Sequence, residues 1–332
     1  MEHRFDRESE RDAAVIQLSG TNLASRDKLI EEYRLRSEAA FAPATLRNYR
    51  QILKGFIQWC EQEGHHHTPP IEPKVIAEYI DHLGGKIRST TIETRLWAIA
   101  EYHRSHFQPN PCRHRLVELA LKGVKRRYGA AVRQAPPLTK LEVLKTIRRL
   151  GDSRRDVRDK ALLWIASDSW CRASEIVAFR VRDIIRQDDG SSLLFVHRSK
   201  TDPYGEGAYA FLSDRGTEAA LAWVELAGLK HDDPLLTKSQ PNARVAPLNP
   251  TSLSRILKKC TGRDDISAHS TRIGGVHDAF RIGCDLSSIM VAGRWSSPEM
   301  PARYGRRILA SQSAAARVAE VYNDQLNDDL SG

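Results

Sequence analysis

Apolar side chains recur at three- and four-residue steps through residues 24–133, which places them on one face of an α-helix. The pattern is strongest over Thr45–Glu63 and stops at Gly64. It predicts helices at Arg26–Ala40, Thr45–Glu63, Pro73–Leu83, Ser89–His106 and Cys112–Tyr128. No alternating, strand-like run competes with them, so we expect residues 24–133 to form an all-α domain.

A second, mostly α domain is expected after a linker at residues 134–138. Pro136 and Pro137 cannot continue a helix, and Thr139 with Glu142 has the capping-box spacing that starts the next one. The pattern then predicts helices at Lys140–Leu150, Arg155–Trp170 and Ala173–Phe179, strands at Ser191–His197 and Tyr209–Leu212, and helices from Thr217 onward. Breaks in these later helices are expected at Gly228–Pro250, Gly283 and Ser296–Pro301.

The two ends of the chain carry different patterns. Residues 1–23 mix both charge signs without an apolar run, so we expect a flexible segment and no secretion signal. Residues 313–330 have a helical pattern with one apolar face, formed by Ala315, Val318, Ala319, Val321, Tyr322 and Leu326. This face needs a partner, which is either its own domain or a neighbouring molecule.

The charge indicates a polyanionic partner. The chain has a formal net charge of +9 and an isoelectric point of about 9.4. Residues 24–133 contain nineteen basic and twelve acidic side chains, a net charge of +7, whereas residues 1–23 have −2 and residues 134–332 have +4. A basic helical segment of this kind is a candidate nucleic-acid-binding module, although an ordinary solvated surface would also account for it.

Composition excludes several other classes. Apolar residues make up 41% of the chain, but runs such as Ala161–Ala166 are far shorter than the roughly 20 residues that span a bilayer. The five cysteines are scattered and contain no C-x-x-C pair, which favours a reducing cytosol and gives no zinc site. The sequence therefore predicts a cytoplasmic protein with no membrane contact, no metal and no cofactor.

Seven residues in the second domain form a pattern suited to a phosphate site. The nucleotide-binding, metalloprotease and serine-hydrolase motifs are all absent, and His65–His67 is best interpreted as a loop at a helix end. Instead, two arginines lie at the start of or on predicted helices, a lysine lies at the turn after a predicted strand, and a tyrosine lies near the C-terminal end of the chain. In chain order the set is Arg172, Glu175, Lys200, His269, Arg272, Trp295 and Tyr304. Each residue alone is unremarkable, and only the ordered set is informative.

In this order the seven residues resemble the tyrosine recombinase family, specifically its Cre-like members. The resemblance extends from about residue 24 to the end and implies a two-domain DNA clamp, with a SAM-like core-binding domain at 24–133 and a catalytic domain at 139–332. Trp295 favours the Cre-like branch, because many family members have histidine there. Pro298 and Pro301 depart from an unbroken helix before Tyr304, so a turn is expected.

The resemblance implies a role for each residue. Tyr304 would be the nucleophile that forms a 3′-phosphotyrosine. Arg172 and Arg272 would neutralise the phosphate, and Trp295 would donate its indole N–H to it. Lys200 would be the general acid for the 5′-oxygen, His269 would manage the tyrosine proton, and Glu175 would brace Arg172. No metal or cofactor is implied.

Candidate DNA contacts lie mostly in the first domain. We expect them on the polar face of the second helix, at the start of the fourth, at the end of the fifth and on a helix after Pro250. The predicted residues are Arg47, Asn48, Arg50, Gln51, Lys54, Arg88, Thr90, Thr91, Thr94, Lys122, Lys125, Arg126, Ser252, Arg255 and Lys258.

The leading hypothesis is a bacterial, phage or plasmid site-specific recombinase that acts on inverted-repeat half-sites. It would exchange strands through a Holliday junction in a tetramer on two DNA sites, joined by a docking helix at 313–330, and the missing arm-binding domain suggests few accessory proteins. A telomere resolvase or a type IB topoisomerase uses the same residues, and a catalytically silent DNA-binding regulator is the third alternative. The target site, the spacer and the biological role cannot be predicted from the sequence.

Overall fold

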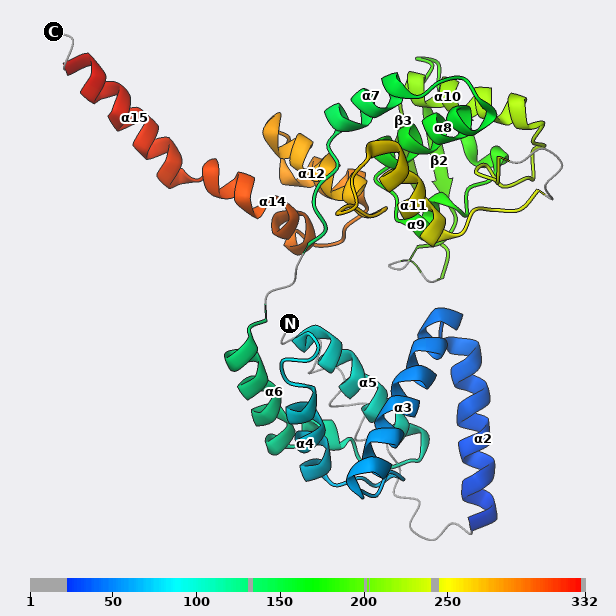
Figure 1. Ribbon diagram of the computed structural model, residues 1–332, viewed down its shortest axis with the longest axis vertical. Helices are drawn as coiled ribbons and strands as arrows, with labels where there is room; N and C mark the ends of the chain where they lie inside the picture. Colours follow the sequence, from blue (N-terminus) through cyan, green and yellow to red (C-terminus); the bar gives the residue numbers. More distant parts are fainter. Residues whose placement is uncertain (1–22, 131–133, 200–201, 203, 240–244, 330–332) are drawn as a thin grey trace. The chain divides into compact units, whose positions relative to one another are not determined.

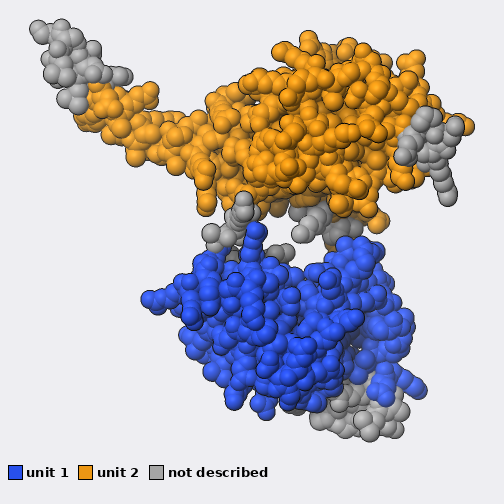
Figure 2. Space-filling model, viewed as in Figure 1, with its two compact units in different colours: residues 1–133 blue, residues 134–332 orange. Residues whose placement is uncertain are grey.

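The computed structural model describes residues 23–130, 134–199, 202, 204–239 and 245–329. The chain divides into two compact units, residues 1–133 and residues 134–332, which are coloured separately in Figure 2. Each unit has its own buried cluster of apolar side chains, and the two are described separately. The flexible segment predicted at residues 1–23 lies outside the described residues, apart from Leu23.

Unit 1 is all helical, as predicted. Its described elements are α2 (Leu23–Ala40), α3 (Pro43–Glu63), α4 (Pro73–Leu83), α5 (Ser89–Ser105), the 3₁₀ turn η1 (Pro111–Arg113) and α6 (Arg115–Tyr128). Phe56, Ile76 and Ile92 are fully buried at the centre of the unit, where α3, α4 and α5 meet. The three- and four-residue spacing seen in the sequence is therefore the core-facing stripe of these helices.

Unit 2 is also mainly helical. Its described elements are α7 (Lys140–Arg149), α8 (Arg154–Asp168), α9 (Ala173–Ile176), the 3₁₀ turn η2 (Val181–Asp183), β1 (Ile184–Arg186), β2 (Ser192–Val196), β3 (Ala208–Leu212), α10 (Asp214–Ala227), α11 (Pro250–Thr261), α12 (Ser270–Arg281), α13 (Leu286–Gly293), α14 (Glu299–Ser311) and α15 (Ala314–Asp329).

The small sheet is antiparallel with the order β1-β2-β3, and its register pairs Ile184 with Leu194 and Leu194 with Ala210. The sequence predicted β2 and β3 but missed β1, because a strand of three residues is too short to show an alternating pattern. Several helix bounds also differ from the prediction by two or three residues: α2 begins at Leu23 instead of Arg26, α6 begins at Arg115 instead of Cys112, and α8 ends at Asp168 instead of Trp170. α9 ends at Ile176 instead of Phe179, and α10 begins at Asp214 because the Ser213 hydroxyl accepts a hydrogen bond from Gly216 N and caps it.

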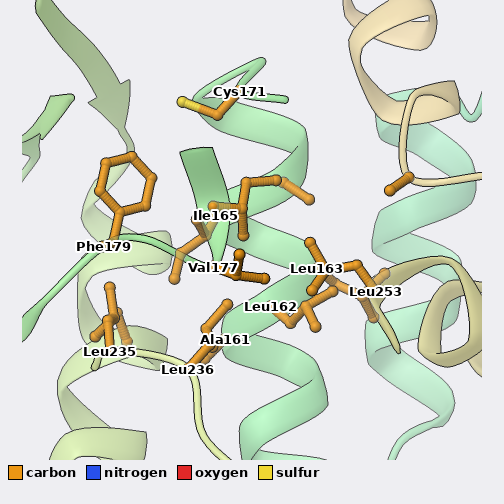
Figure 3. Close-up of a cluster of buried hydrophobic side chains, with 14 of the residues drawn as sticks. Ala161, Leu162, Leu163, Ile165, Cys171, Val177, Phe179, Leu235, Leu236 and Leu253 are labelled. Carbon is orange, nitrogen blue, oxygen red and sulfur yellow. The ribbon is translucent and has the colours of Figure 1, made fainter. Parts of the chain in front are cut away.

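Helix α8 is the centre of the unit's core. Ala161, Leu162, Leu163 and Ile165 are fully buried, and Figure 3 shows them facing side chains such as Phe179 from the surrounding elements. α10, α12, α7 and β3 all contact α8. The continuous apolar run at 161–166 therefore marks a helix covered on all sides.

Helix α12 is held in place by the segment that precedes α7. Leu138 N donates a 2.8 Å hydrogen bond to Ser270 O at the start of α12, and Lys140 N donates one of 2.6 Å to Asp278 Oδ2. A Cβ at Gly274 would lie 1.9 Å from the Leu138 carbonyl oxygen, so only glycine permits this close approach. A second apolar cluster, which includes Ile273, packs α12 against α13 and α14.

Helix α15 lies at the end of the chain (Figure 1), and all of its described side chains except the partly buried Ala316 are exposed. Val318, Val321 and Tyr322 expose 54%, 56% and 62% of their surfaces. The predicted amphipathic helix is thus present, and its apolar face is not covered by its own unit; Leu326 lies outside the residues whose side chains are described. No helix in the described part of the chain is long and apolar enough to cross a membrane.

Candidate active site

The first part of the site is an arginine–glutamate pair at the start of α9. Arg172 is the residue before α9, and Glu175 lies in its only turn. The Glu175 carboxylate accepts hydrogen bonds from Arg172 N at 2.9 Å and from Arg172 Nη1 at 2.7 Å. The side chain of Glu175 is only 2% exposed, while that of Arg172 is 21% exposed. Glu175 therefore fixes one edge of the Arg172 guanidinium and leaves the remaining N–H groups available to a ligand.

Helix α12 supplies the second arginine and a histidine. Arg272 is almost fully buried, and its Nη1 donates a 2.7 Å hydrogen bond to the carbonyl of Trp170. Its Nη2 donates to the carbonyl of Gly293. Trp170 has a positive φ of 49°, a conformation that non-glycine residues seldom adopt and that concentrates at functional sites. Arg272 is thus held by backbone carbonyls and has no acidic partner of its own in direct contact among the described residues.

Trp295 stacks on Arg272. The guanidinium carbon lies 4.1 Å from the centre of the indole ring, within the range of a cation–π contact. A Cβ at Gly293 would lie 1.8 Å from the Trp295 ring, so glycine is required for the ring to lie there. The ring also meets Tyr304 edge-on, with centroids 5.9 Å apart. Trp295 therefore connects the second arginine to the tyrosine.

Tyr304 lies on α14, and its hydroxyl oxygen is 2.7 Å from His269 Nε2. The predicted turn before it is present: α13 ends at Gly293, and α14 begins at Glu299 with Pro301 in its first turn, where proline costs no helical hydrogen bond. His277 Nε2, on α12, is 3.0 Å from the Tyr304 carbonyl oxygen, so α12 and the residue before it contact the tyrosine at its backbone and its hydroxyl.

Charge in the site is unbalanced. Arg172, Arg272 and Arg294 contribute three guanidinium groups, and Glu175 is the one carboxylate that they contact among the described residues, so these four side chains carry a net charge of +2. Burial, followed by the charges of Arg172 and Arg294, lowers the pKa of Arg272 to about 10. A buried cluster of like charges is costly unless an anion joins it. The site is therefore prepared for a doubly charged, phosphate-like group.

The same environment sets the states of the two proton-transfer candidates. Burial, with the charges of Arg272 and Arg172, lowers the pKa of His269, so its ring is neutral at pH 7. Burial raises the pKa of Tyr304, and this effect outweighs the opposing charges of Arg272 and Arg172. A protonated phenol beside a neutral imidazole is the pair needed for transfer of the tyrosine proton.

Comparison with known proteins finds similarity to one family. Residues 30–107 match the family model of the phage integrase N-terminal SAM-like domain. The chain is 27% identical to the recombinase cre of Escherichia phage P1, over 92% of this chain and 96% of that relative. It is also 27% identical to an integrase/recombinase xerD homolog of Selenomonas ruminantium, over 86% of this chain and 88% of that relative. These matches support the predicted Cre-like tyrosine recombinase family.

A solved structure agrees with the fold of this chain. The XerH site-specific recombinase bound to a palindromic difH substrate matches with a TM-score of 0.63, over 89% of this chain and 85% of that chain, at 18% identity. The predicted fold class is therefore confirmed, and the sequence matches support the predicted family. The seven predicted site residues stay individual predictions, and the structure brings six of them together: Arg172, Glu175, His269, Arg272, Trp295 and Tyr304.

The seventh residue, Lys200, lies outside the described residues. The described part of its hairpin is anchored at both ends. His197 Nε2 is 2.7 Å from Asp183 Oδ1, and the Asp202 carboxylate accepts hydrogen bonds from the backbone N–H of Gly205 and Gly207.

The DNA contacts predicted for this chain lie mainly on exposed surface. On α3, Arg47, Asn48, Gln51 and Lys54 are exposed, as is Arg50, which also pairs with Glu38 at 2.8 Å. At the start of α5 the exposed residues are Arg88, Thr90, Thr91 and Thr94. On α6, Lys122 and Arg126 are exposed, whereas Lys125 pairs with Glu93 at 2.5 Å.

The three candidates on α11 form a smaller group in unit 2. Arg255 is exposed and contacts Ser252, with 3.3 Å between Nη2 and Oγ, while Lys258 donates to the carbonyl of Asp264 at 2.6 Å. Lys125 and Lys258 have protein partners and are only partly exposed, so they are weaker candidates than the exposed residues of the set. No group of three or more potential metal-ligating side chains occurs among the described residues.

Sequence reasoning missed two residues of the site. Arg294 contacts Glu175 and His277 contacts the backbone of Tyr304. Arg294 stands directly before Trp295, but no spacing rule indicates that its side chain reaches back to α9. His277 lies eight residues after His269, close to two helical turns, and that spacing could have placed both on the face of α12 that meets Tyr304.

Proposed function

We propose that this protein is a site-specific DNA recombinase that cleaves and rejoins double-stranded DNA through a 3′-phosphotyrosine intermediate. The observation that carries the proposal is the 2.7 Å approach of Tyr304 Oη to His269 Nε2, beside three arginines that contact a single carboxylate among the described residues. Both full-length relatives are recombinases by name, and the XerH structure contains a DNA substrate after cleavage.

The first chemical step is attack of Tyr304 Oη on a DNA phosphorus. The phenolic proton passes to His269 Nε2, which is free to accept it when the imidazole carries its own proton on Nδ1. A bond forms between Oη and phosphorus, and the bond from phosphorus to the 5′-oxygen breaks. Lys200 gives that oxygen a proton, leaving a free 5′-hydroxyl and a 3′-phosphotyrosine.

Arg172 and Arg272 stabilise this step electrostatically. The phosphorane carries more negative charge on its non-bridging oxygens than the ground-state diester does, and two guanidiniums held before the substrate arrives favour it selectively. Losing one such contact typically slows the reaction on the order of 10²–10³-fold. Trp295 keeps Arg272 flat against its ring, and its indole N–H has no hydrogen-bond partner among the described residues.

Strand exchange follows by the reverse chemistry. A 5′-hydroxyl from the other duplex attacks the phosphotyrosine and releases Tyr304, so the energy of the phosphodiester is conserved and no nucleotide is consumed. We infer that four copies on two DNA sites with inverted-repeat half-sites perform this twice, through a Holliday junction. The +7 helical unit at 24–133 would grip the DNA, and accessory proteins are not expected to be necessary.

The decisive experiment is covalent trapping. A randomised DNA library is selected for binding to the purified protein, and the recovered duplex is incubated with the protein and separated under denaturing conditions. We expect an adduct of protein and DNA. A protein that binds the selected duplex tightly but never becomes attached to it would instead be a DNA-binding regulator.

Cleavage is expected to continue unchanged in excess EDTA. The charge on the phosphorane is neutralised by Arg172 and Arg272, so the proposed steps include no role for a divalent ion. The rate of adduct formation is measured with and without chelator. Loss of cleavage with EDTA, followed by recovery when Mg²⁺ is added, would contradict the proposed chemistry.

Cleavage should also fall in acid with a midpoint below pH 6.5, the ordinary pKa of histidine. His269 can accept the tyrosine proton only when it is neutral, and a lowered pKa keeps it neutral to a more acidic pH. The rate at subsaturating DNA, which reports the free protein, is followed from pH 5 to pH 8. His269→Gln, measured in parallel, should be slow and should lack this acidic decline. A parental midpoint above pH 6.5 would remove His269 from the proton-accepting role.

A further inference from the structure

Arg294 connects the two halves of the site. It follows α13 directly, and its side chain reaches back to the segment that carries Arg172. Nη2 lies 2.9 Å from Glu175 Oε2, and Nη1 donates to the Ser169 carbonyl at 3.2 Å. The side chain is 11% exposed, so these contacts are largely shielded from water, unlike those of a surface ion pair.

Glu175 is shared between the two arginines. Oε1 accepts from Arg172 Nη1, and Oε2 accepts both from Arg172 N and from Arg294 Nη2. Each carboxylate oxygen therefore has a guanidinium partner, which fixes the rotation of the carboxylate group. Without Arg294, one buried oxygen would keep only the backbone N–H, and the carboxylate would hold Arg172 less rigidly.

The backbone at Arg294 acts on the second arginine. Arg294 has φ 54° and ψ 50°, in the left-handed region that glycine adopts readily and that strains the backbone of a residue with a Cβ. The turn formed there directs the preceding carbonyl, that of Gly293, at Arg272 Nη2. In addition, Arg294 Nε is buried without a hydrogen-bond partner among the described residues. Stability alone would favour a different residue at 294, and strain of this kind is characteristic of functional sites.

We propose that Arg294 is a positioning residue that fixes the orientation of both phosphate-binding arginines. It acts on Arg172 through Glu175 and on Arg272 through the turn at Gly293. The inference rests on the proposed function and adds a residue to it. Arg294 does not touch the DNA phosphate in this role, because its Nη groups are already engaged with Glu175 and Ser169.

The charge state of Glu175 supports this role. Burial by itself raises the pKa of Glu175, but the hydrogen bonds from Arg172 and the charges of Arg294 and Arg172 outweigh it, so its pKa lies below the ordinary value. The carboxylate thus remains ionised at neutral pH and can hold both guanidiniums.

The test compares Arg294→Gly, Arg294→Lys and Glu175→Gln in the full-length protein. Glycine relieves the strain of the left-handed backbone and removes the guanidinium. Lysine keeps the positive charge but lacks the two Nη groups that contact Glu175 and Ser169 at the same time. The probe is the half-site duplex recovered by selection. Its dissociation constant and the single-turnover rate of adduct formation at saturating DNA are measured separately, and thermal melting verifies folding. Arg281→Ala, which removes an exposed arginine from α12, is the control and should match the parent.

We expect Arg294→Gly to slow adduct formation about 10- to 100-fold, the usual effect of losing a group that orients a functional side chain. Its half-site dissociation constant should stay within about twofold of the parent. Arg294→Lys should recover part of the rate. The double variant Glu175→Gln/Arg294→Gly should be no slower than the slower single variant, because both act through one contact.

Other outcomes would overturn the inference in distinguishable ways. A parental rate for Arg294→Gly, or strictly multiplicative effects in the double variant, would remove the positioning role while leaving the recombinase proposal intact. Weakened half-site binding with an unchanged rate at saturation would make Arg294 a direct DNA contact. A parent protein that forms no adduct would overturn the proposed function itself. If Arg294→Gly fails to fold, Arg294→Lys and Glu175→Gln provide the same comparison.

Discussion

Tyr304→Phe is expected to bind its DNA site with the parental affinity and to form no covalent adduct. The substitution removes only the hydroxyl oxygen, which is the proposed nucleophile. The ring would keep its edge-on contacts with His269 and Trp295. The loss of one hydrogen bond costs about 1 kcal/mol of folding free energy, which a folded protein of this size tolerates.

The measurement for this variant is a pair of gels. A native gel reports the protein–DNA complex, and a denaturing gel reports the adduct, whose attachment site is mapped by proteolysis. Tyr209→Phe and Tyr322→Phe serve as matched controls, because both tyrosines are exposed. Each control should form the adduct at the parental rate. An adduct mapped to Tyr209, Tyr322 or any tyrosine other than Tyr304 would show that the nucleophile has been misassigned.

The fold could largely be predicted from the sequence, because helical periodicity is local. The stripe on α3 and the capping box of Thr139 with Glu142 each lie within a few turns of chain, and both are present in the structure. β1 could not be predicted, because Ile184–Arg186 becomes a strand only through pairing with β2. Tertiary pairing decides the conformation of such a short segment, and local propensity does not.

The site was predictable as a set of residues but not as a set of contacts. The order of Arg172, His269, Arg272 and Tyr304 suggested a phosphate site, yet their approach depends on close packing that no pattern encodes. The ring of Trp295 lies over Arg272 only because residue 293 has no Cβ. The turn after α13 likewise needs a left-handed residue, and an arginine there gives no glycine-like signal.

Truncation after Ser313 is expected to abolish recombination while leaving half-site binding within about threefold of the parent. This end point removes α15 but keeps Gln312, whose Nε2 donates to the carbonyl of Phe280 and so anchors the end of α14. Removal should cost the protein's own fold little, because Val318, Val321 and Tyr322 are exposed in the single chain.

The expected loss comes from assembly. If α15 is received by a neighbouring copy, each of its large apolar side chains that becomes fully buried contributes about 1.5–3 kcal/mol. Since 1.4 kcal/mol corresponds to a tenfold change in association, losing three of them would prevent assembly at ordinary concentrations. In the truncated protein the helical unit, with its net charge of +7, would still bind DNA, so DNA binding would be retained while tetramer assembly is lost.

Native gels on one-site and two-site DNA distinguish these steps, and recombination is followed on the two-site DNA. Val318→Asp with Val321→Asp should reproduce the truncation, because it places charge on the apolar face. Glu320→Ala, on the opposite side of the helix, is the matched control and should recombine normally. A truncated protein that still forms the two-site complex and recombines would show that α15 is not an assembly element, and that the tetramer is held together by other surfaces.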